Sequence, residues 1–234
     1  MIDKRPFNSL GQFDNDWLAA RYHFSFSGYH DPGRVQWGAL RVWNDDRIEP
    51  KTGFGAHPHS DMEIITYVRT GAITHQDSLG NKGRTEAGDV QVMSAGSGVT
   101  HAEYNLEDEP TTLYQIWITP KTRGGEPSWG AAKFPKAERA GALVTLASGY
   151  ADDQEAGALP IRQDAKVLAA TLTPGQEVVY APEAGRHIYL AVAKGSASVN
   201  GVDLDARDGA AIRDESALRI RAKNDAEIVL VDAP

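Results

Sequence analysis

Gly53-Phe54-Gly55-Ala56-His57-Pro58-His59, joined with His101-Ala102-Glu103 after a gap of 41 residues, is the part of the sequence that decides fold and chemistry. In each motif, two polar side chains are spaced two residues apart. Because alternate side chains of an extended strand point to the same face, each pair presents both its groups to one side of a sheet. The motifs therefore predict two neighbouring strands that bring three imidazoles and one carboxylate together.

Three imidazoles and one carboxylate are a ligand set for a first-row transition metal. The chain contains no cysteine, so disulfides and thiolate zinc sites are excluded and any metal is held by histidine and carboxylate. We predict that His57, His59, His101 and Glu103 bind one divalent ion. Fe(II) is the first choice and Cu(II) the second, while Ni(II), Mn(II) and Zn(II) also fit. The alternative is that His57 and His59 are surface histidines on an exposed strand edge.

The carboxylate ligand is open to more than one assignment. Asp61 and Glu63 share strand parity with His57 and His59, so either could line the same face. We favour Glu103 because it lies beside a ligand on the second strand. Glu63 is then a carboxylate behind the ligands or a wall of the site, with a simple structural role as the equal alternative.

The other histidines lack ligand spacing. His75 ends a strand-like segment, and we expect it to be a hydrogen-bonded histidine of the core or of a turn. His23, His30 and His187 have no partner two residues away, and we assign them no function.

Composition narrows the partners of the chain. The 234 residues are 41% hydrophobic and 24% charged, and 24 basic against 32 acidic residues give a net charge of −8. Nucleic acid and anionic membranes require a basic surface, so neither is expected as a partner. No apolar run approaches the ~18 residues of a membrane span, and residues 1–6 contain no apolar secretory segment. We expect a soluble, cytoplasmic and monomeric protein.

Short segments rich in β-branched and aromatic residues predict an all-β fold in both halves. Turn residues separate them at 44–46, 79–81, 87–89 and 96–98. The predicted strands are 38–42, 63–68, 72–75, 90–93, 113–118, 167–171, 177–180, 187–193, 197–199, 218–220 and 227–231.

The second half is similar to the first. Val68-Arg69-Thr70-Gly71 followed by Gly88 has a counterpart in Val192-Ala193-Lys194-Gly195 followed by Gly209, at offsets of about 120 residues. Carrying His57 and His59 forward by 124 residues, the offset from Val68 to Val192, gives Ala181 and Glu183, so the histidine pair is missing there. We predict a duplication in which the second copy has lost its metal ligands.

Two barrels follow from this repeat, and a polar Pro/Gly stretch at 119–127 separates them. We predict a first domain at 1–125 with the metal site, an irregular linker at 126–160, and a second domain at 161–234 without metal ligands.

With these residues in view, the sequence resembles the pirin family of the cupin superfamily. The first motif continues through Glu63, Tyr67 and Gly71, and the second runs from Gly88 to Glu103. Segments 23–26 and 113–117 also match the family. The general cupin motif has a glutamate near Glu63, but Glu63 is one residue out of phase. Glu103 takes its place, as in pirins.

The resemblance is to bacterial pirins described as quercetin 2,3-dioxygenases. It implies two cupin barrels, and a reaction in which dioxygen cleaves a flavonol such as quercetin with release of carbon monoxide. In this reaction Glu103 would accept the proton of the flavonol 3-hydroxyl as catalytic base. Two alternatives stay open: a redox-sensing regulatory protein that binds a protein partner without turnover, and a sugar- or acid-binding cupin with a structural metal.

Overall fold

The computed structural model describes residues 1–234, and almost all of its regular structure is β-sheet. The first half forms a seven-stranded sheet in the order β12-β9-β6-β11-β4-β3-β2 and a four-stranded sheet in the order β5-β10-β7-β8. We call these two sheets the first barrel. Its strands are β2 (Gly11–Asp14), β3 (Leu18–Tyr22), β4 (Leu40–Ile48), β5 (Thr52–His59), β6 (Glu63–Thr70), β7 (Ala72–Asp77), β8 (Lys82–Glu86), β9 (Val90–Ser94), β10 (Val99–Asn105), β11 (Thr111–Ile118) and β12 (Ser128–Ala132).

The second half repeats this arrangement and forms the second barrel. Its larger sheet has the order β1-β20-β17-β22-β15-β13-β14 and its smaller sheet the order β16-β21-β18-β19. Its strands are β13 (Val144–Ser148), β14 (Leu159–Pro160), β15 (Lys166–Leu172), β16 (Glu177–Tyr180), β17 (His187–Lys194), β18 (Ala197–Val199), β19 (Val202–Leu204), β20 (Gly209–Ile212), β21 (Leu218–Ala222) and β22 (Ala226–Ala233).

The start of the chain supplies an edge strand to the second barrel. β1 (Ile2–Arg5) precedes the first barrel in sequence but pairs antiparallel with β20 of the second. Residues 126–160, expected to be an irregular linker, contain β12 of the first barrel, β13 and β14 of the second, and the short helix α1 (Ala151–Glu155). Strand pairing therefore links both termini of the chain into the second barrel. None of the helices is long and apolar enough to span a membrane.

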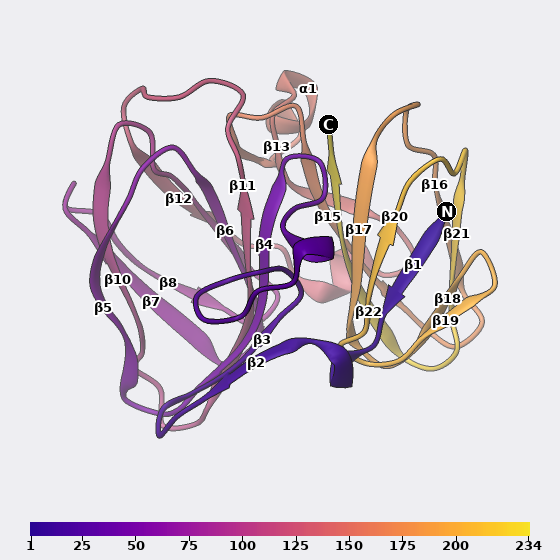
Figure 1. The fold of residues 1–234 in the computed structure, drawn as a ribbon, viewed down its shortest axis with the longest axis horizontal. Helices are drawn as coiled ribbons and strands as arrows, with labels where there is room; N and C mark the ends of the chain where they lie inside the picture. Colours follow the sequence, from indigo (N-terminus) through magenta and orange to yellow (C-terminus); the bar gives the residue numbers. More distant parts are fainter.

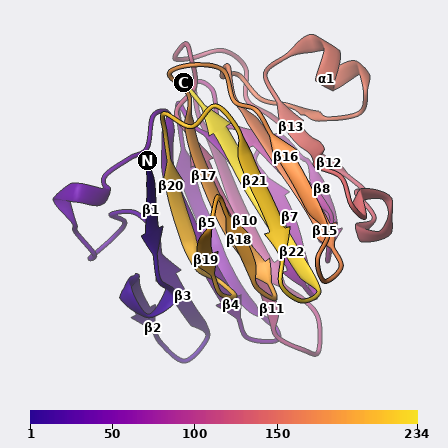
Figure 2. The same ribbon diagram turned by 90° about the vertical axis from the view of Figure 1, so that its right-hand side faces the viewer.

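The two seven-stranded sheets lie back to back in the middle of the molecule, and the smaller sheets lie on opposite outer sides (Figure 1). Seen from the second barrel, its strands lie in front of those of the first (Figure 2). A core of 23 buried residues fills the space between the sheets. It includes Trp43, Tyr67 and Tyr114 from the first half and Val167, Tyr189 and Val229 from the second. Burial of this shared apolar surface holds the barrels together.

The interiors of the barrels differ in chemistry. The second is filled by 18 buried apolar residues in one continuous cluster. The first has only separate apolar clusters of seven and four residues. Between them, buried polar side chains such as Thr66, Gln91, Glu103 and Gln115 point inward. Only the first barrel therefore has an interior suited to polar chemistry.

Backbone turns confirm the internal repeat. Gly71 and Gly195 follow equivalent strands, and their φ angles of 74° and 77° are left-handed, which favours glycine. The counterpart of Gly88, however, is Arg207 and not the predicted Gly209. Both donate their N–H to the equivalent valine, Val68 or Val192, and both have positive φ.

One predicted turn is wrong. Asn44-Asp45-Asp46 lies inside β4, which continues to Ile48. Burial explains the difference, because Asp45 is ion-paired with Arg69 and with Arg207 of the second barrel (Nε–Oδ2 2.6 Å). Tertiary ion pairs thus override a local turn preference. The predicted turns at 79–81, 87–89 and 96–98 do connect consecutive strands.

Candidate metal centre

The four-stranded sheet of the first barrel places the two sequence motifs side by side. β5 and β10 are antiparallel neighbours, with His57 opposite His101 and Pro58 opposite Thr100. β5 is the edge strand of this sheet, so Pro58 removes no hydrogen bond from a central ladder. A β-bulge between His101 and Glu103 shifts the register at the site.

The three imidazoles converge, as the strand pairing requires. Ring centroids of His57 and His59 are 4.8 Å apart, those of His57 and His101 4.4 Å, and those of His59 and His101 4.9 Å. One ring nitrogen from each lies within 4.8 Å of the others, close enough to share one ion. His101 is buried, while His57 and His59 are half-buried at the end of β5, which we call the mouth of the first barrel.

The protonation of these rings suits metal binding. Burial first, and then the neighbouring histidines, lower the pKa of His59 to about 4 and that of His101 to about 3. Both rings are therefore neutral near pH 7, as imidazole ligands must be. His57 Nδ1 lies 2.7 Å from the carbonyl oxygen of Gly55, to which it donates, so its Nε2 keeps the free lone pair.

Glu103 lies behind the triad in the polar interior. Gln91 Nε2 donates to its Oε1 at 2.6 Å, and Gln115 Nε2 donates to its Oε2 at 2.7 Å. A carboxylate oxygen of Glu103 lies within 4.8 Å of ring nitrogens of His101 and His75. The complete triad of His57, His59 and His101 forms a separate group that does not include Glu103. The role of Glu103 as fourth ligand thus stays a prediction, as does metal binding by the three histidines.

Burial raises the pKa of Glu103 to about 7, although hydrogen bonds from Thr66, Gln115 and Gln91 lower it. In the metal-free protein, its ionisation therefore opposes folding. This loss of stability is absent well below pH 4.5, develops as the pH rises, and is complete above pH 7. Glu103→Gln removes this ionisation. From pH 5 to pH 8, we expect the unfolding free energy of the variant minus that of wild type to rise by roughly 2 to 3 kcal/mol. Denaturant unfolding of metal-free proteins at the two pH values measures this difference. Parallel pH profiles would contradict it.

The two other candidate carboxylates stabilise loops. Glu63 is buried, and its Oε2 accepts hydrogen bonds from Ser94 Oγ at 2.5 Å and from the backbone N–H of Arg162 at 3.1 Å. Asp61 Oδ1 accepts the backbone N–H of Gly124 at 2.7 Å. Through these hydrogen bonds, Asp61 and Glu63 bind the loops that contain Gly124 and Arg162 to the first barrel.

His75 is a buried, hydrogen-bonded histidine, and it also contacts the site. Its Nδ1 is 3.4 Å from His101 Nδ1, and its Nε2 is 3.0 Å from Asp77 Oδ2. The prediction from the sequence misses this contact with the metal motifs. The signal was present, because His75-Gln76-Asp77 has the same two-residue spacing, and β7 pairs with β10.

Aromatic side chains flank the imidazoles. Trp117 meets His59 edge-on, with ring centroids 4.9 Å apart, and Phe26 in turn packs edge-on against Trp117, with centroids 5.4 Å apart. Phe54 lies 6.4 Å from His57 and is itself held by Trp17. All four aromatic residues are only partly buried. They form an aromatic wall at the barrel mouth.

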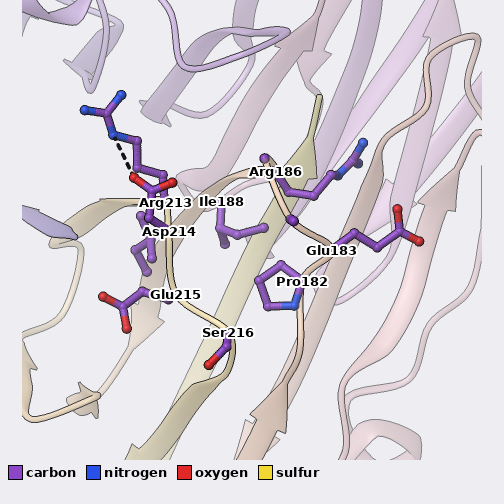
Figure 3. A pocket seen from close by; sticks show the side chains of 11 residues that line it. Pro182, Glu183, Arg186, Ile188, Arg213, Asp214, Glu215 and Ser216 are labelled. Atoms are coloured by element: carbon purple, nitrogen blue, oxygen red, sulfur yellow. Dashed lines mark ion pairs between the residues drawn. The ribbon is translucent and has the colours of Figure 1, made fainter.

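The second barrel has no equivalent site. By strand pairing, the positions of His57 and His101 are taken by Val178 and Ile220, which are buried in the apolar interior. Glu183 lies in the loop after β16 and lines a cavity of about 350 Å³ at this mouth. Figure 3 shows the cavity, with Arg213 paired to Asp214 at its rim and no histidine among its lining residues. Two ligand positions of the first barrel are thus apolar in the second.

Comparison with known proteins places the chain among relatives of full length. A family profile described as Pirin matches residues 4–118, and one described as quercetinase C-terminal cupin domain matches residues 146–233. A pirin-like protein of Caulobacter vibrioides is 64% identical over 233 residues, which cover 100% of both chains. A quercetin 2,3-dioxygenase of Escherichia coli K12 is 41% identical over 235 residues, covering 100% of this chain and 99% of the relative.

A solved structure gives the same architecture with a metal. The bacterial pirin YhhW from Escherichia coli, in complex with nickel(II), superposes with a TM-score of 0.93 at 41% identity and covers 100% of this chain and 99% of its own.

Proposed function

The chain belongs to the pirin family, and we propose that it is a metal-dependent dioxygenase that cleaves a flavonol with dioxygen and releases carbon monoxide. One observation carries the proposal. Three converging imidazoles at a barrel mouth are flanked by aromatic side chains and backed by a buried carboxylate whose pKa lies near neutrality. Relatives named quercetin 2,3-dioxygenase support the choice of substrate.

The donor set fits a divalent transition metal, with Fe(II) as our preferred ion. Two neutral rings of lowered pKa supply lone pairs without losing a proton, and the absence of cysteine leaves no softer donor. When bound, the ion supplies Lewis acidity toward the 3-oxygen of the flavonol. That a related pirin was solved in complex with nickel(II) supports binding of a divalent ion by this fold and leaves the native ion to be measured.

Glu103 is suited to accept the proton of the flavonol 3-hydroxyl. A base works best when its pKa is near the working pH, and burial brings the pKa of Glu103 to about 7. Gln91 of β9 and Gln115 of β11 each donate a hydrogen bond to one of its oxygens, which fixes the direction of the carboxylate. The base is thus held in one orientation before substrate arrives.

The aromatic wall provides the contact surface for a planar substrate. Trp117 contacts His59, Phe54 lies near His57, and both aromatic side chains are partly exposed. Aromatic pairs prefer offset or edge-to-face contacts, worth about 0.5–1.5 kcal/mol each. A flavonol ring system between these side chains would direct its 3-hydroxyl toward the imidazoles and shield the reacting carbons from water.

The test uses protein loaded separately with iron(II), copper(II), nickel(II) or manganese(II), mixed with quercetin in air. We expect loss of the flavonol absorbance band and release of one carbon monoxide per quercetin with at least one ion. Glu103→Gln should lower turnover by about 10² or more because the base is removed. Glu63→Gln is the matched control, since Glu63 is an equally buried carboxylate that binds loop residues, and its effect should be much smaller.

Two outcomes would overturn this function. If every metal-loaded form leaves quercetin intact although it binds its ion, the regulatory alternative without turnover is favoured. If Glu103→Gln turns over quercetin as fast as wild type, Glu103 is not the base.

A further inference from the structure

We propose that Asp77, acting through His75, fixes the proton of His101 on Nδ1 and thereby leaves Nε2 of His101 free to bind the metal. The observation behind it is a line of three buried side chains, Asp77–His75–His101, that ends at the imidazole triad. His75 and Asp77 are positioning residues, since neither needs to touch the ion. This inference rests on the metal-binding part of the proposed function and is independent of the substrate.

The first of the three side chains is Asp77, whose carboxylate is held in one orientation and acts as a hydrogen-bond acceptor. Asp77 Oδ1 accepts the backbone N–H groups of Leu79 and Asn81, each at 3.0 Å, and Oδ2 accepts Asn81 Nδ2 at 2.9 Å. These donors hold the side chain in one orientation in the β7–β8 turn. An ionised carboxylate only accepts hydrogen bonds. His75 Nε2, at 3.0 Å from Oδ2, must therefore carry the proton.

The next two steps follow from the tautomers of neutral imidazole. With its proton on Nε2, His75 has a lone pair on Nδ1. This Nδ1 faces Nδ1 of His101 at 3.4 Å, and two ring nitrogens in contact need one proton between them. His101 supplies it, so its Nδ1–H donates to His75 and its lone pair is on Nε2. His57 reaches the same state by donating from Nδ1 to the Gly55 carbonyl.

Packing prevents the ring of His75 from rotating to another orientation. Its ring is fully buried and stacks on Trp129, with centroids 4.9 Å apart and planes 10° from parallel. Trp129 in turn lies over Gly83, where a Cβ would overlap the indole ring. The glycine thus permits the stack. The orientation of His75, and with it the proton on His101, is set by the fold before any metal arrives.

Asp77→Asn preserves the shape of the side chain but reverses the direction of its hydrogen bond with His75. The amide of asparagine can donate to His75 Nε2, which moves the His75 proton to Nδ1. Two N–H groups would then face each other, so His101 must carry its proton on Nε2 and lose its ligand lone pair. Loss of a partner behind a metal ligand typically lowers metal affinity 10- to 100-fold.

The experiment has two readouts on the full-length chain. Long-range ¹H–¹⁵N spectra of the metal-free proteins report the tautomer of each histidine, and competition with a chelator for nickel(II) reports affinity. We expect Nδ1–H on His101 in wild type, Nε2–H in Asp77→Asn, and an affinity lowered 10- to 100-fold. Asn81→Ala is the matched control. It removes one donor to Asp77 but keeps the carboxylate, so the tautomer should not change.

A second pair of variants keeps the test decisive if Asp77→Asn does not fold. His75→Gln retains a carbonyl acceptor for His101 Nδ1–H, whereas His75→Leu has none. We expect the glutamine variant to hold nickel(II) at least 10-fold more tightly than the leucine variant.

Several results would overturn the inference. They are an unchanged His101 tautomer in Asp77→Asn, equal affinities in the two His75 variants, and ¹⁵N shifts showing that His75 itself binds the ion. Failure of wild type to bind any metal at the triad would instead refute the proposed function.

Discussion

His101→Ala is expected to leave the protein without its metal. His101 is the buried member of the triad and contacts both other imidazoles. Structural sites with four protein ligands bind zinc with about 10–16 kcal/mol, or roughly 2.5–4 kcal/mol per ligand, so one lost ligand should weaken binding on the order of 10²–10³-fold. Elemental analysis of protein purified without added metal should fall from about one ion per chain to almost none.

His30→Ala is the control for this loss, because His30 is exposed and has no histidine or carboxylate partner at ligand spacing. It should keep the wild-type metal content. If His101→Ala retains a full equivalent of metal, the ion lies elsewhere and the triad is not its site.

Trp43→Ala is expected to be the most damaging change outside the site. Trp43 is fully buried between the barrels, with ring centroids 5.2 Å from Tyr114 and 5.3 Å from Tyr189 of the other half. Removal of such a large side chain leaves a cavity and typically lowers the free energy of unfolding by about 3–5 kcal/mol. Because both seven-stranded sheets line this cavity, the barrels should lose stability together. Urea unfolding followed by circular dichroism measures the change.

Leu79→Ala serves as the reference, since Leu79 is half exposed and surface changes of this kind usually alter stability by about 0.5 kcal/mol or less. A loss below about 1 kcal/mol in Trp43→Ala, or separate unfolding of the two halves, would show that the barrels do not share one core.

The centre of the fold was predictable because strands have a simple period. Residues two apart face the same way, so His57 with His59 and His101 with Glu103 already predict two strands around one point. The structure places these strands as direct neighbours. Glycine and asparagine at the turns predicted their ends, since their backbone preferences are local. The repeat predicted the second barrel and its lost histidines.

The features of the fold and of the site that the sequence does not predict depend on tertiary contacts, which no local sequence pattern contains. Asn44-Asp45-Asp46 has turn composition, yet Asp45 meets Arg207 from 162 residues away, and the segment is a buried strand. β1 was missed because its partner, β20, is more than 200 residues later. His75 shows a third case. Its spacing to Asp77 fits the same rule, but only the pairing of β7 with β10 brings it against His101.

The most direct test of the account is an anomalous difference map from crystals of metal-loaded protein, recorded at the absorption edge of the bound ion. We predict one strong peak per chain about 2.0–2.2 Å from a ring nitrogen of each of His57, His59 and His101. For His57 and His101 that nitrogen should be Nε2. A map with no peak at the triad, or with its main peak at the mouth of the second barrel, would contradict the central claim.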